Sequence, residues 1–200
     1  MTDETDLTDR LIATALELLE TQPAERLSIR EVAQRVGVSH QAPYVHFGDK
    51  QRFLAAVAGA GLERAASDAI ARVATAGADP SVRLHALMDS YVEFIDTRPH
   101  VHDLAYGPLV AMSDHPRLQA AAIEYWTLLR ETVTANQPPG VDDAEVLRRC
   151  ATTWGTVYGI ARLNAAGKIP RTVPADRAQL LSDAIEAMRQ GWQRADDLSH

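Results

Sequence analysis

Two short helices separated by one glycine are the feature that most constrains this sequence. Ser28 opens a capping box with Glu31, in which the serine oxygen accepts a hydrogen bond from the third-residue amide and the glutamate reaches back. Apolar residues at helical spacing follow, and Gly37 can adopt the left-handed conformation that ends a helix. Ser39 is expected to cap a second helix over residues 39–45. The pattern predicts two helices joined by a tight turn.

The second helix has few apolar side chains to bury, which suits a helix presented to a DNA groove. His40 and Gln41 are expected to reach base edges, and glutamine can pair with N6 and N7 of adenine. Ser39, Tyr44 and Lys50 are expected to bind phosphates. The alternative is a helical hairpin that serves only as core, and it leaves this polar helix without a role.

The charge distribution is uneven along the chain. A net charge of -7 argues against a protein that coats nucleic acid indiscriminately. Residues 26–52 nevertheless carry five basic side chains and two acidic ones, so this segment is locally basic. An ordinary solvated helix surface is the alternative interpretation of that cluster.

Helical periodicity runs along almost the whole chain, and no alternating stretch predicts a strand, so the fold class is all-α. The first helix is expected to stop at Gln22-Pro23. We predict an N-terminal three-helix helix-turn-helix domain over residues 1–48 and a C-terminal helical domain over 49–200. The helices of the second domain are expected at about 50–74, from Asp79-Pro80 to Pro99, and at 99–112, 116–136, 142–166 and 174–195.

The compartment predicted from the sequence is the cytoplasm. Cys150 is the single cysteine and cannot form an internal disulfide, which fits a reducing interior. The N-terminus lacks the basic and apolar regions of a signal peptide, and no apolar run is long enough to span a membrane.

Residues 27–39 (LSIREVAQRVGVS) and 43–50 (PYVHFGDK) closely resemble the N-terminal domain of the TetR/AcrR family. Segments 154–159 and 166–170 look like parts of one subgroup's ligand domain. The resemblance implies a homodimeric regulator, expected to be a repressor, that binds a palindromic double-stranded operator and is released by a small molecule. It implies these DNA contacts: Ser28, Arg30, Ser39, His40, Gln41, Pro43, Tyr44, His46 and Lys50. Val45 departs from the pattern, because relatives often carry a basic residue there, and Gln22-Pro23 replaces a usual glycine.

The last two predicted helices carry the best dimerisation signal. Gly155 and Gly159 lie one turn apart and permit close backbone approach. A stripe with nearly heptad spacing follows in the last helix: Leu181, Ala184, Ile185, Met188 and Trp192. The stripe could equally pack as internal core, and the family resemblance favours a dimer interface.

Aromatic and apolar residues of the C-terminal domain are candidates for lining a ligand pocket. They are Tyr91, Phe94, Tyr106, Met112, Trp126, Trp154 and Tyr158. Their composition points to an apolar or aromatic effector, although such residues also form ordinary cores.

An enzyme is the main alternative class, and the sequence gives it little support. His100 and His102 lie two residues apart and face different directions on a helix, so we expect no metal site. We find no nucleophile motif and no phosphate-binding loop, and Cys150 has no activating base nearby in sequence. No catalytic residue and no cofactor are therefore predicted. A ligand-independent DNA-binding adaptor with the same fold is a further alternative.

Overall fold

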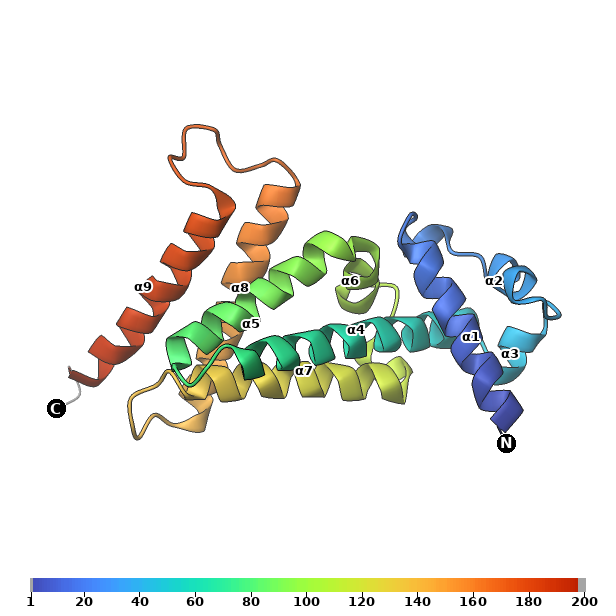
Figure 1. Ribbon diagram of the computed structural model, residues 1–200, viewed down its shortest axis with the longest axis horizontal. Coiled ribbons are helices and arrows are strands. Elements are labelled where there is room, and N and C mark those ends of the chain that lie inside the picture. The colour runs from blue at the N-terminus through green and yellow to red at the C-terminus, as the bar shows by residue number, and fades with distance from the viewer. Residues whose placement is uncertain (1, 198–200) are drawn as a thin grey trace. The chain divides into compact units, whose positions relative to one another are not determined.

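The computed structural model describes the backbone of residues 2–197 and the side chains of residues 6–194 (Figure 1). Over this range the chain is helical, which confirms the all-α prediction. The α-helices are α1 (Thr2–Leu19), α2 (Ile29–Val36), α3 (Ala42–Phe47), α4 (Lys50–Thr75), α5 (Pro80–Thr97), α6 (Pro99–Tyr106), α7 (Pro116–Thr134), α8 (Asp143–Ala165) and α9 (Arg177–Asp197). Short 3-10 turns lie at Ala24–Arg26 and Met112–Asp114.

The helices group into two compact units. Unit 1 contains residues 1–67 and 97–125, and unit 2 contains residues 68–96 and 126–200. The first part of α4 therefore groups with the N-terminal helices, and every residue from 53 to 62 is buried, as expected for a helix covered on all sides. The functional boundary between residues 48 and 49 stays a prediction.

Unit 1 is built around the N-terminal helices. Helix α1 packs against α2, α3 and α6, and α2 packs against α3. One face of α1 is buried at Leu11, Ala15, Leu18 and Leu19, and Phe47 meets Phe53 edge to face at 5.0 Å between ring centroids. Helix α7 approaches α4 closely at Gly59, where an added Cβ would lie 2.6 Å from the backbone nitrogen of Leu118. These contacts fix the short helices α2 and α3 on a longer scaffold.

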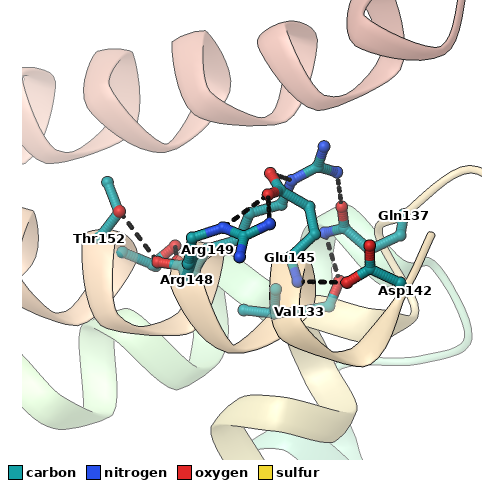
Figure 2. A network of polar contacts seen from close by, with 8 residues as sticks. Val133, Gln137, Asp142, Glu145, Arg148, Arg149 and Thr152 are labelled. Carbon is teal, nitrogen blue, oxygen red and sulfur yellow. Dashed lines mark hydrogen bonds and ion pairs between the residues drawn. The ribbon is translucent and has the colours of Figure 1, made fainter. Parts of the chain in front are cut away.

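In unit 2, α8 and α9 lie side by side (Figure 1). A polar network joins the end of α7 to the first turns of α8 (Figure 2). Asp142 caps α8 by accepting a hydrogen bond from the amide of Glu145 at 2.8 Å, and the Glu145 carboxylate accepts from Nε of Arg149 at 2.7 Å. Arg149 also contacts Gln137, and its guanidinium lies 6.0 Å from the Trp192 ring centroid. The network links α7, α8 and α9.

Some helix boundaries were predicted correctly and others were not. Asp79 caps α5 through the amide of Ser81 at 2.8 Å, so the predicted start is confirmed. Helix α6 ends at Tyr106 and not at Met112, because Gly107 and Pro108 interrupt it. Helix α9 begins at Arg177 and not at Pro174, because Asp176 accepts from the amide of Gln179 at 2.8 Å and sets the first turn.

Candidate functional site

Helix α2 begins and ends as its sequence predicts. Ser28 is the N-cap, and its Oγ accepts a hydrogen bond from the amide of Glu31 at 3.4 Å. The Glu31 carboxylate binds Arg35 one turn further on, at 2.9 Å, and does not reach back to the Ser28 amide as the capping box predicted. Gly37 has a φ of +80°, and the amide of Val38 reaches back to the carbonyl of Ala33 at 3.0 Å. This closure turns the chain sharply towards α3.

Helix α3 begins later than predicted. It starts at Ala42 with Gln41 as its N-cap, and no side chain caps it, so the predicted capping role of Ser39 is wrong. The residues from Ser39 to Gln41 instead form a turn, closed by the amide of Ala42 on the carbonyl of Ser39 at 3.0 Å. Pro43 explains the late start, because a proline fits without losing a bond only in the first turn of a helix.

One side of α3 is exposed and the other is buried. Pro43 and Phe47 are buried, whereas the side chain of Tyr44 is 45% exposed and that of Val45 is 78% exposed. Ser39, His40 and Gln41 in the preceding turn are exposed as well. The inner edge of α3 therefore holds the helix in place, and its outer edge presents polar groups together with one apolar side chain.

Most other predicted contact residues are also accessible. Ser28, Arg30 and Lys50 are exposed, and His46 is half-buried. The prediction that Pro43 contacts DNA needs correction, because its side chain is buried and is not available to a DNA groove. The structure thus brings the remaining predicted positions onto α3, the turn before it and the first turns of α2 and α4.

Two supporting residues were missed by the sequence reasoning. Asp49 caps α4, since its Oδ1 accepts from the amide of Arg52 at 2.8 Å, and this places Lys50 at the first position of the helix. Asp49 directly before a predicted helix is a signal for an N-cap, and this signal was available in the sequence. Arg10 of α1 donates to the carbonyl of Val36 at 3.0 Å and satisfies the end of α2, a contact between residues too distant in sequence to be predicted.

The predicted ligand residues divide between the two units. In unit 2, Tyr91 Oη accepts a hydrogen bond from Nε1 of Trp154 at 2.7 Å, and Trp126 meets Trp154 edge to face at 6.4 Å between centroids. Phe94 is fully buried and Tyr158 is exposed. Tyr106 and Met112 instead belong to unit 1, and burial raises the pKa of Tyr106. Tyr91, Trp126 and Trp154 thus lie together in unit 2.

The predicted dimerisation residues also divide into two groups. Leu181, Ile185 and Trp192 are buried within the single chain, with α9 packed on α8, so little of their surface remains for a partner. Of the other stripe residues, Ala184 and Met188 are half-buried. Gly155 is exposed and Gly159 is half-buried, and an added Cβ at either would meet no atom within 4 Å. The two predicted glycines therefore lie on a surface of α8 that is accessible in the isolated chain.

Other site types find no support in the part of the chain that the structure describes. Among those residues, no three metal-ligating side chains gather at one place. None of the described helices is long and apolar enough to cross a membrane. Cys150 is buried, and burial raises the pKa of its thiol to about 11, the opposite of an activated nucleophile.

The capped helix, the glycine turn and the outward-facing second helix together define a DNA-binding protein of the helix-turn-helix class. Two family models match the sequence. Residues 11–57 match the bacterial regulatory proteins of the tetR family, and residues 84–188 match the tetracyclin repressor-like C-terminal domain. The chain therefore belongs to the TetR family of transcriptional regulators. Regulators of this family are non-enzymatic DNA-binding proteins, which removes the enzyme alternative.

Solved structures give the same fold. A protein of unknown function from Rhodococcus sp. RHA1 is 27% identical, with a TM-score of 0.75 over 93% of this chain and 95% of that one. A transcriptional regulator from the same organism is 26% identical, with a TM-score of 0.65 over 92% and 96% of the two chains. The regulator FadR from Bacillus subtilis, in complex with stearoyl-CoA, is 12% identical, with a TM-score of 0.67 over 91% and 97%. No curated protein sequence matches the chain.

Proposed function

We propose that this regulator is a repressor that binds a palindromic operator as a homodimer and is released by a small-molecule effector. The observation that carries the proposal is the outer edge of α3 and its preceding turn, which is exposed while Pro43 and Phe47 are buried beneath it. A polar helix edge held outward on a rigid base suits the DNA major groove.

Residues of this edge divide by the chemistry of their side chains. Gln41 and His40 are assigned to base edges, and Val45 to a thymine methyl group, because apolar side chains recognise that group. Tyr44 and Lys50 are assigned to phosphates. The DNA backbone is also assigned contacts from Ser39 and His46. It receives two more from the start of α2, where Ser28 and Arg30 lie.

The proposed dimer surface is the open face of α8. Leu147, Ala151, Gly155 and Tyr158 are all exposed and lie at helical spacing on one face, with side-chain exposures of 41% for Leu147 and 38% for Tyr158. Gly159 is assigned to the same face, and the accessible parts of Ala184 and Met188 add to it from α9. A two-fold dimer that binds successive major grooves needs its recognition helices about 34 to 36 Å apart.

The proposed effector-binding residues are the aromatic cluster of Tyr91, Trp126 and Trp154 in unit 2. An apolar or aromatic ligand that separates Tyr91 from Trp154 must replace their hydrogen bond, so a ligand with one polar group is favoured. The ligand shifts the protein off its operator only if it prefers the state that does not bind DNA.

The DNA-binding proposal is tested by selecting bound sequences from random duplexes and then comparing two lysine variants. Lys50→Ala should weaken operator binding and lower the slope of log affinity against log salt by about 1 per half-site. Lys168→Ala is the matched control, because it removes the chain's other lysine, which is exposed on the connection between α8 and α9. It should leave the operator affinity and the salt slope unchanged. Equal behaviour of the two variants, or selected sites without two-fold symmetry, would contradict the proposal.

The dimer surface has its own test. Gly155→Arg should convert the dimer to monomer in sedimentation experiments, because a long charged side chain cannot enter a close helix contact. Ala120→Arg places the same charge on an exposed position of α7 and should leave the dimer intact. A dimer that persists in Gly155→Arg would place the interface elsewhere.

The ligand-independent adaptor remains the second candidate. A library of apolar and aromatic compounds, screened against operator binding, separates the two. Release that is lost in Trp154→Ala supports the effector site, and operator binding that no compound alters favours the adaptor.

A further inference from the structure

Unit 1 contains a pocket between α1, α4 and the start of α6, with a volume of about 380 Å³ including the part open to solvent. Its apolar side chains are Leu16 and Leu19 from α1 and Val101 from α6. All of its lining residues belong to unit 1, whereas the aromatic cluster assigned to the effector belongs to unit 2.

Gly61 explains how α4 and α6 come together at this pocket. A Cβ at Gly61 would lie 2.2 Å from Cγ1 of Val101, so only glycine allows this approach. Arg64 follows three residues later, on the same side of α4, and it lines the pocket together with Arg98 at the start of α6. Close packing at the glycine thus brings two arginine residues into the lining of one pocket.

The charges around the pocket favour an anion. Arg64 is exposed and forms no hydrogen bond or ion pair with any residue that the structure describes. Nη1 of Arg98 is shielded from solvent, where attraction to a negative group is less screened. Arg98 is also the N-cap of α6, and no side chain caps that helix, so the positive end of its dipole faces the same region. Glu20 is the one carboxylate in the lining.

We propose that this pocket binds a small amphipathic carboxylate. The alkyl chain lies on Leu16, Leu19 and Val101, and the carboxylate accepts hydrogen bonds from Arg64 and Arg98. Arginine recognises a carboxylate through paired N–H donors, and the apolar residues supply the burial that a free carboxylate such as acetate lacks. A ligand held there contacts α1, α4 and α6 together and stabilises unit 1 in the folded state.

The test uses sodium octanoate and the full chain, with binding measured by calorimetry and by the shift in unfolding temperature. Arg64→Gln should raise the Kd about tenfold, the loss of one charge-assisted hydrogen bond. Glu20→Gln should lower the Kd a few-fold, because it removes the repelling charge. Arg83→Gln is the matched control, since Arg83 is an exposed arginine of α5 outside the pocket, and it should change nothing.

Three outcomes would overturn the proposal. They are no octanoate binding up to about 1 mM, equal affinity for octanoate and 1-octanol, and a Kd that Trp154→Phe changes while Arg64→Gln does not. The last outcome would assign the ligand to unit 2. Arg98→Gln should act like Arg64→Gln, and if it fails to fold, Arg64→Gln and Glu20→Gln still decide the question through their opposite signs. Operator binding is measured without octanoate, so the proposed function is tested independently of this pocket.

Discussion

Gly59 gives the sharpest stability prediction, because the atoms around it cannot move aside. A Cβ there would lie 2.6 Å from the backbone nitrogen of Leu118 and 2.9 Å from the carbonyl carbon of Arg117. Ordinary contact begins near 3.4 Å, so α4 and α7 would have to separate by roughly 0.8 Å in Gly59→Ala. Backbone atoms have no rotamers through which to relieve the clash.

The expected magnitude follows from two opposing effects. Overpacking costs about 1–3 kcal/mol, and the rigid neighbours place this site at the upper end. Alanine favours a helix over glycine by about 1 kcal/mol, which leaves a net loss of about 2 kcal/mol for Gly59→Ala. For a chain of this size that loss lowers the unfolding temperature by about 4–8 °C.

The assay is thermal and urea unfolding followed by circular dichroism, with Gly191→Ala as the control. Gly191 lies in α9, where an added Cβ meets nothing within 4 Å, so the same substitution should stabilise the chain by up to about 1 kcal/mol. Gly59→Ala and Gly191→Ala therefore differ in sign. A Gly59→Ala variant as stable as the original chain would refute the close approach of α4 and α7.

Three further predictions follow from individual side chains. Ser28→Ala should cost about 1 kcal/mol in urea unfolding, because it removes the cap of α2, and Ser28→Asp should retain most of that stability. The thiol of Cys150, with its pKa raised to about 11 by burial, should react with Ellman's reagent at pH 8 far more slowly in the native protein than in guanidinium, and rapid native labelling would contradict its burial. Hydrogen bonds from Arg189 and Gln190 lower the pKa of Glu186 to about 2. The carboxylate therefore contributes stability above about pH 4.5 that is lost as the pH falls towards 2. Glu186→Gln should reduce this loss of stability between about pH 4.5 and 2, most clearly at low salt.

Local signals in the sequence were enough to predict much of the fold. The caps at Ser28, Asp79 and Asp142 each depend on one side chain and one nearby amide, so their helix starts could be predicted without tertiary contacts. The start of α3 was predicted too early, because Ser39 has the right chemistry for a cap while Pro43 fixes the register of the first turn.

The less successful site predictions concern which neighbour buries a side chain. The stripe of Leu181, Ile185 and Trp192 has the same spacing whether it packs on α8 or on a second chain, and the structure buries it within one chain. Tyr106 and Met112 were likewise candidates because they are aromatic or apolar, as Tyr91 is, yet they belong to the other unit. Helical periodicity identifies an apolar face and does not identify its partner.

The aromatic cluster also determines what fluorescence can report. The chain has three tryptophans, Trp126, Trp154 and Trp192, and all of them belong to unit 2. Emission excited near 295 nm therefore comes entirely from that unit, while the helix-turn-helix is spectroscopically silent. A titration that changes this emission reports on the surroundings of the tryptophans in unit 2, and a dye on the operator reports on DNA binding, so the two halves of the proposed switch can be followed in one cuvette.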